Sequence, residues 1–200
     1  MKIILDIIEL EWEIFSEVNS IGGKAPCQED FMTFKIMRSS QAEAWNEELL
    51  QSYYNDLALA RSQNRNLMTE KYARMMETTF PEEYQRVKDF LPVLDNQTLG
   101  LIEKIIDIHL KWKIETSEKY PNLAKRGRTI FSKDDTRNST SFETYLRGEL
   151  STNSPKTIQL YEKMTMDFLN RGENLEEIYL LNMVKKYGYD TLEKAEKFAQ

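Results

Sequence analysis

The segment from Pro26 to Arg61, PCQEDFMTFKIMRSSQAEAWNEELLQSYYNDLALAR, contains no glycine and no proline after its first residue. Nothing in it therefore forces a helix to end, and the segment predicts one continuous helix over residues 26–61. At 1.5 Å per residue, such a helix would cross most of a small domain. A chain organised around an element of this length is predicted to be all-helical.

A line of polar residues follows the apolar side of this predicted helix, as a helical wheel shows. Its members are spaced three or four apart: Arg38, Gln41, Trp45, Glu48, Ser52 and Asp56. Polar groups beside buried surface must be paired with one another, with water or with a ligand. The line is therefore a candidate ligand-binding site, although its residues do not specify a reaction.

Composition and charge indicate the class of protein. A chain of 200 residues, 40% hydrophobic and 30% charged, is typical of one soluble globular domain covering residues 1–200. The net charge of −6 argues against a general nucleic-acid binder and against docking on an anionic membrane. Acidic residues interrupt the apolar start of the chain, so neither a signal peptide nor a membrane span is predicted. We therefore expect a cytoplasmic protein.

Periodicity and capping signals predict a multi-helix bundle of seven to nine helices with one long basic loop. The helices that begin near Lys2, Pro26 and Thr98 are expected to form its core. The last two helices are predicted to begin at capping boxes headed by Asn174 and Asp190. The remaining helices are expected over residues 66–80, 81–91, 142–152 and 155–171.

Glu11 is the one acidic residue that falls on the buried side of the first helix. Gly22 and Gly23 are expected to reverse the chain, so that the first two helices pack as antiparallel neighbours. Counting outward from that turn at 1.5 Å per residue places Glu11 and Arg38 at similar depths. The sequence therefore predicts a buried or half-buried ion pair, with Gln41 close enough to hydrogen-bond one partner.

The chain contains one histidine and one cysteine, and each is considered for a catalytic role. His109 lies in the apolar arc of a helix over residues 98–120, where a buried imidazole with one hydrogen bond is the default interpretation. A catalytic or ligand-binding imidazole is the alternative. Cys27 is predicted in the first turn of a helix, where the dipole favours a thiolate that Glu29 and Asp30 oppose. A catalytic pair of Cys27 and His109 is not expected.

Residues 121–141 form a connection without helical periodicity, which is uncommon inside a compact domain. The segment is also the basic region of the chain, with cations at Lys125, Arg126, Arg128, Lys133 and Arg137. A solvated, mobile loop is one interpretation. The other is a flap, with Arg126 and Arg128 among its cations, that grips a phosphate or carboxylate.

Several well-known site motifs are missing. The chain has no Gly-Lys-Ser/Thr phosphate loop, no Gly-x-Ser-x-Gly elbow and no Glu-x-x-His pair of a di-iron bundle. One histidine and one cysteine cannot build a zinc site unless carboxylates supply most ligands. The sequence therefore predicts neither a cofactor nor a metal.

Four segments, GGKAPCQEDF, IMRSSQAEAWNEELLQSY, NRNLMTEKYARMMETTFPEEY and YLRGELST, together resemble a bacterial family catalogued as domain of unknown function 4125. The resemblance extends from Glu11 to about Tyr161 and leaves out the last helices. It includes the positions of Cys27, Arg38, Gln41 and Trp45. The resemblance implies a cytoplasmic bacterial protein and brings no mechanism with it.

Two hypotheses of function follow. In the favoured one, the domain binds a small anionic or polar ligand, or a partner protein, through the polar line on helix 26–61 and the basic loop 121–141. The candidate binding residues are Glu11, Arg38, Gln41, Trp45, Glu48, Asp56, His109, Arg126 and Arg128. The alternative is an enzyme that acts on an anionic substrate, using carboxylates with His109. Convergence of His109 and a carboxylate in a solvent-reachable pocket would favour the enzyme, and a sealed pair would favour the binding module.

Overall fold

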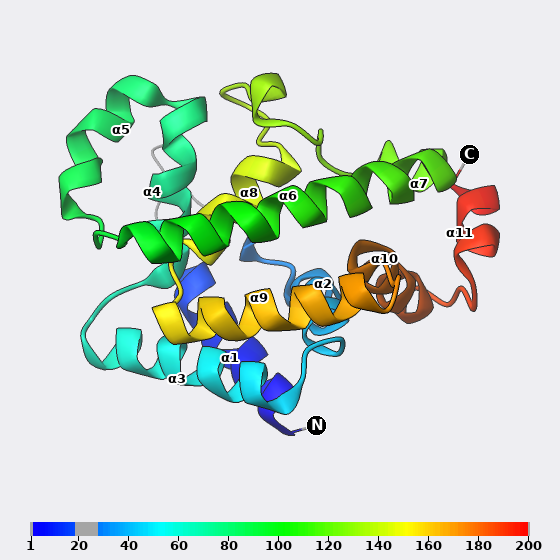
Figure 1. Cartoon of the computed structure of the whole chain (residues 1–200), viewed down its shortest axis with the longest axis horizontal. Coiled ribbons are helices and arrows are strands. Elements are labelled where there is room, and N and C mark those ends of the chain that lie inside the picture. Colours follow the sequence, from blue (N-terminus) through cyan, green and yellow to red (C-terminus); the bar gives the residue numbers. More distant parts are fainter. Residues whose placement is uncertain (1, 19–27, 200) are drawn as a thin grey trace.

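A computed structural model describes residues 2–18 and 28–199 of the chain (Figure 1). Within these ranges the protein is all-helical and its helices pack into one bundle. The α-helices are α1 (Lys2–Ser16), α2 (Phe31–Ala42), α3 (Glu47–Ser62), α4 (Leu67–Thr79), α5 (Pro81–Val87), α6 (Asn96–Lys119), α7 (Pro121–Ala124), α8 (Phe142–Leu150), α9 (Pro155–Asn170), α10 (Leu175–Lys186) and α11 (Leu192–Phe198). Short 3₁₀ turns lie at η2 (Lys88–Phe90) and η3 (Ser132–Asp134).

The longest helix, α6, has 24 residues and crosses the whole bundle (Figure 1). It packs against α8, α9 and α10, while α3 packs against α1 and α9. Helix α1 also contacts α2 and α4, and α4 packs closely against α8. Helices α1, α4 and α8 therefore lie close enough to one another for side chains from all three to meet.

Side-chain caps explain where many of these helices begin. Asp95, Ser154 and Asn174 each accept a hydrogen bond from the backbone N–H three residues later, which satisfies a donor that the helix leaves unpaired. The predicted start at Asp190 is wrong by one residue. The cap of α11 is Thr191, and Asp190 pairs with Lys194 instead.

The main hydrophobic core is centred on α6 and its neighbours. Ile102, Ile105 and Ile106 of α6 are at most 1% exposed, as are Leu49 and Leu50 of α3. Burial of each such side chain is worth about 1.5–3 kcal/mol. The expected central position of the helices that begin near Lys2 and Thr98 agrees with this core.

The prediction of one continuous helix over residues 26–61 is wrong. Helix α2 ends at Ala42, and α3 begins at Glu47 after a turn that contains Trp45. The side chain of Asn46 accepts the N–H of Leu49, and its extended backbone (ψ 163°) ends helical continuity. Asn followed by two glutamates is a helix-start signal that needs neither glycine nor proline.

This break is one reason why the described residues contain eleven α-helices where seven to nine are predicted. The other reason is the single-turn helix α7, which is too short to show periodicity. The predicted polar line is also divided by the break. Arg38 and Gln41 lie on α2, Trp45 lies in the turn, and the other three members lie on α3.

The connection over residues 121–141 has more structure than an aperiodic sequence suggests. It contains α7, η3 and an isolated antiparallel bridge between Thr136 and Ser139. The start of α8 is bonded to the middle of the connection, because the N–H groups of Phe142 and Glu143 donate to the carbonyls of Thr129 and Ile130. The lack of periodicity thus reflects short turns and an irregular path, while the mobility and the anion binding of the connection stay predictions.

Two sequence expectations fall outside the described ranges. Cys27 and the chain reversal at Gly22 and Gly23 both lie in residues 19–27. In the part of the chain that is described, no helix combines the length and the apolar character that a membrane crossing needs.

Candidate functional site

The predicted ion pair between Glu11 and Arg38 is confirmed. The guanidinium of Arg38 on α2 donates through Nε to Glu11 Oε2 at 2.8 Å and through Nη2 to Glu11 Oε1 at 2.5 Å. Glu11 is 0% exposed and Arg38 is 8% exposed. Gln41, one turn further along α2, accepts from Arg38 Nη1 at 2.9 Å, as predicted.

The pair belongs to a larger group, here named the charge cluster: Glu11, Arg38, Tyr53, Lys71 and Glu149. Arg38 Nη1 also donates to Glu149 Oε1 at 2.9 Å, and Lys71 Nζ donates to Glu149 Oε2 at 2.5 Å. The hydroxyl of Tyr53 donates to Glu11 Oε1 at 2.6 Å. Two carboxylates therefore face two cations, so the charge cluster is internally neutral and bonded throughout.

Burial and ion pairing shift the pKa values of Glu149, Arg38 and Lys71 in opposite directions. Burial raises the pKa of Glu149, but Arg38 and Lys71 lower it further, so that it falls to about 2. Burial likewise favours neutral Lys71 and Arg38, yet the facing carboxylates keep the pKa of each cation above its ordinary value. Glu149, Arg38 and Lys71 therefore stay charged near neutral pH.

The basic connection reaches the charge cluster through Tyr145 of α8. Lys71 Nζ lies 3.4 Å from the centroid of this ring, and the guanidinium carbon of Arg128 lies 4.4 Å from it. Arg128 also donates to the carbonyl of Thr140 at 2.9 Å. Arg126, the other predicted cation, donates to the carbonyl of Ala199 near the end of α11. The two arginines therefore bind different parts of the protein.

Trp45 joins the charge cluster to a second polar group. Its ring packs edge-on against Tyr53 and Tyr161, with centroids 5.5 and 5.7 Å apart. Its Nε1 donates to the hydroxyl of Tyr179 at 2.9 Å, and the hydroxyls of Tyr161 and Tyr179 are 3.3 Å apart. Trp45, a member of the predicted polar line, is therefore a buried tryptophan whose one hydrogen-bond donor is satisfied.

His109 forms the second polar group with Glu176 of α10. Its Nδ1 lies 2.8 Å from Glu176 Oε1, and its ring packs against Trp112 and Tyr161. The imidazole is 0% exposed and the glutamate is 8% exposed. His109 Nε2 is buried without a hydrogen-bond partner in the described part of the chain. The pair is sealed in the core. The carboxylate that bonds His109 is that of Glu176, and not that of Glu11, Glu48 or Asp56.

Two residues of the α3 half of the line contribute to contacts with α9. Ser52 Oγ lies 2.8 Å from Thr157 Oγ1, and Asp56 accepts the N–H of Ser154 at 2.9 Å. Both therefore fix the start of α9 against α3. Glu48 is different, because it is exposed and has no partner among the described residues.

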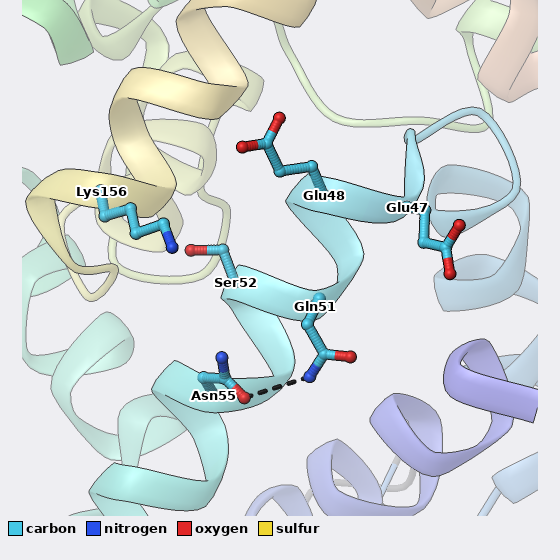
Figure 2. Close-up of a pocket in the computed structure, with 6 residues that line it drawn as sticks. All are labelled: Glu47, Glu48, Gln51, Ser52, Asn55 and Lys156. Carbon is cyan, nitrogen blue, oxygen red and sulfur yellow. Dashed lines mark hydrogen bonds between the residues drawn. The ribbon is translucent and has the colours of Figure 1, made fainter.

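Glu48 lines a shallow surface depression between α3 and α9, here named the α3–α9 depression (Figure 2). All of its lining residues are polar: Glu47, Glu48, Gln51, Ser52, Asn55 and Lys156. Figure 2 shows Lys156 and Ser52 pointing toward each other, the carboxylate of Glu48 about one turn away on the same side of α3, and Glu47 turned away. Gln51 donates to Asn55 at 3.1 Å, and both residues are exposed.

The structure thus separates the predicted site residues into four places. Glu11, Arg38 and Gln41 belong with the charge cluster, which Arg128 reaches through Tyr145, while Trp45 leads to His109. Glu48 and Asp56 belong to the α3–α9 contact, and Arg126 lies beside the end of α11. Figure 1 shows the connection over residues 121–141 on the other side of α6 from α3, and none of its cations lines the α3–α9 depression.

Sequence reasoning did not single out Lys71, Glu149 or Glu176 as site residues. Lys71 and Glu176 are buried, and Glu149 is only 16% exposed. Lys156 was missed as well. The wheel positions of Lys71 and Glu149 carried a signal, since both fall on faces that their helices bury, but partners so far apart in sequence cannot be paired from periodicity alone.

The described residues hold no group of three or more His, Cys, Asp or Glu side chains placed to bind a metal ion together. In the charge cluster, cations occupy the carboxylate oxygens that a metal would need.

Comparison with known proteins gives one match. The model of the family described as protein of unknown function (DUF4125) matches residues 1–197, so the similarity includes the last helices that the sequence resemblance left out. No curated protein and no solved structure matches the chain.

Proposed function

The chain belongs to the DUF4125 family, and we propose that it is a binding module for a small polar ligand held in the α3–α9 depression. The ligand carries an anionic group for the ammonium of Lys156 and a hydrogen-bond donor for the carboxylate of Glu48. An amino acid has both groups, and a phosphorylated metabolite with hydroxyl or amino donors has them too.

One observation carries the proposal: Glu48 and Lys156 line the same depression and neither has a hydrogen-bond or ion-pair partner in the described residues. In the charge cluster, by contrast, the carboxylates and cations are already bonded to one another. Unpaired groups of opposite sign that share a reachable surface are what a zwitterionic or polar ligand needs.

The charge cluster is a weaker candidate for ligand binding. Arg38 uses Nε, Nη1 and Nη2 on protein acceptors, and both oxygens of Glu11 and Glu149 are occupied. A ligand would have to displace these bonds from groups that are almost fully buried. Such a fully bonded, neutral arrangement supports a structural role in holding α1, α2, α4 and α8 together.

The alternative of an enzyme that uses carboxylates with His109 draws on the unpartnered Nε2 of that residue. An imidazole whose Nδ1 contacts Glu176 while its Nε2 is unpartnered has the geometry of a general base oriented by a carboxylate. Its 0% exposure keeps a substrate away unless helices separate, so binding without chemistry has the better support.

Saturation-transfer NMR of the whole chain with the proteinogenic amino acids and a panel of phosphorylated metabolites tests the proposal. Calorimetry of each hit then compares Lys156→Gln and Glu48→Gln with the unmodified chain. Each substitution is expected to weaken binding about tenfold or more.

Lys163→Gln is the matched control, because Lys163 is an exposed lysine of the same helix that does not line the depression. It is expected to leave affinity unchanged. The proposal fails if no probe binds, or if the substitutions at Lys156 and Lys163 have equal effects.

A further inference from the structure

A second depression lies between α1 and α2, where the two helices pack against each other, and it is named here the α1–α2 groove. Its lining combines apolar and charged side chains, among them Lys2, Leu5, Met32, Lys35 and Ile36. Leu5 from α1 is 47% exposed and Met32 from α2 is 64% exposed. Two helices therefore present large apolar side chains to solvent in one place.

The charge of the α1–α2 groove is opposite to that of the whole protein. Lys186 of α10 pairs with Glu43 at 2.7 Å. Lys2 and Lys35 form no ion pair with any described residue, so the rim keeps an uncompensated positive charge. The chain as a whole has a net charge of −6. An apolar floor edged by free cations complements a partner that is apolar on one side and acidic beside it.

We propose that the α1–α2 groove binds an acidic amphipathic helix of a partner protein. Apolar residues of that helix at spacings of three and four pack on Leu5, Met32 and Ile36, and Asp or Glu residues beside them meet Lys2 and Lys35. Recognition of this kind uses a hydrophobic groove for the apolar stripe of a helix. The flexible side chain of Met32 adapts to the shape of such a stripe.

An anionic membrane has the same combination of apolar and acidic character but fits the groove less well. Asp6 directly follows Leu5 on α1 and Glu9 lies one turn further along that helix, and a negatively charged bilayer would repel both of them along with the acidic chain as a whole. A single peptide helix can position its acidic residues over the two lysines and avoid these carboxylates.

The proposal is independent of ligand binding in the α3–α9 depression, because the two sets of lining residues have no member in common. Substitutions in one set therefore test one proposal without altering the other.

The test is a displayed library of 18-residue peptides with leucine fixed at helical spacing and Asp, Glu, Lys or Arg varied between. The library is selected against the whole chain. Selected peptides are expected to be enriched in Asp and Glu and to become helical on binding. Fluorescence anisotropy is expected to show that Lys35→Glu and Met32→Asp each weaken binding about tenfold or more.

Phe90→Asp is the matched control, since Phe90 is 86% exposed and lies outside the groove. It is expected to leave peptide affinity unchanged. The proposal is overturned if selection yields no binder, if basic peptides win, or if Met32→Asp and Phe90→Asp have equal effects. Sedimentation of the chain with phosphatidylglycerol vesicles, lost in Lys35→Glu, would overturn it in favour of a lipid surface.

Discussion

Glu11 of α1 holds Arg38 of α2 with both of its oxygens, at 2.8 and 2.5 Å, in a place that solvent does not reach. The pair contributes little net stability as such, because desolvation offsets most of the attraction. Loss of a single partner has a larger effect, since the remaining charge stays buried without compensation.

We expect Arg38→Ala to lower the free energy of unfolding by about 3–5 kcal/mol and Glu11→Ala to have a similar effect. The double variant should cost much less than the sum of the two, because no unpaired charge from this pair is left. Urea unfolding followed by circular dichroism measures all three. Arg61→Ala is the control, because Arg61 pairs with Glu13 at the surface and such pairs are worth about 0–1 kcal/mol. Additive single effects would show that the pair is not coupled.

Glu149 should make the protein sensitive to acid. Its pKa is about 2 in the native state and 4.5 in the unfolded chain, so the unfolded chain binds the additional proton between these pH values. The stability that Glu149 contributes is therefore complete above about pH 4.5 and is lost as the pH falls toward 2, by about 3 kcal/mol at most. Urea unfolding across this range should show a smaller pH dependence for Glu149→Gln. Equal slopes for the two proteins would contradict the assignment.

Gly148 of α8 should not tolerate a methyl group. A Cβ atom there would lie 2.9 Å from Met75 Cγ and 3.1 Å from the backbone oxygen of Lys71, because α4 and α8 approach closely. We expect Gly148→Ala to destabilise the protein by about 1–3 kcal/mol despite its better helix propensity. Gly100→Ala on α6 is the control, since its Cβ would meet open space, and it should stabilise by about 0.5–1 kcal/mol. Thermal unfolding of both variants decides, and stabilisation by both would mean that the helices do not meet there.

The hydrogen bonds of Asp135 are expected to hold the end of the connection over residues 121–141 in place. Its carboxylate accepts the N–H of Ser141 at 2.6 Å and the hydroxyls of Thr78 and Thr144 at 2.5 Å each. These hydrogen bonds, which outweigh the effect of burial, hold its pKa below the ordinary value. We expect the amide of Ser141 to be protected from exchange in the free protein and to exchange about tenfold faster in Asp135→Ala.

Asp134→Ala is the control for this measurement, because its carboxylate is exposed and has no partner in the described residues. It should leave exchange unchanged. Rapid exchange of the Ser141 amide in the unmodified protein, slowed by added phosphate, would support the anion-gripping flap that the basic sequence suggested.

Periodicity predicted most of the helices because each one buries a stripe that recurs every three or four residues. The same reasoning placed Glu11 and Arg38 together, since both fall on buried faces of consecutive helices. It failed at Asn46, where a side chain ends one helix and starts another without glycine or proline. It also failed for Glu149 and Glu176, because these partners meet Arg38 and His109 only through contacts between helices far apart in sequence.

The charge cluster restricts how this sequence can change over time. Glu11, Arg38, Lys71 and Glu149 balance one another, so a substitution at any one of them strands its partner in the core. Substitutions in the charge cluster are therefore tolerated only when they occur together, such as loss of Lys71 with loss of Glu149. In a set of related chains we expect these four positions to vary jointly or not at all. Glu48 and Lys156, in contrast, are expected to vary independently of the cluster, according to the ligand that each protein binds.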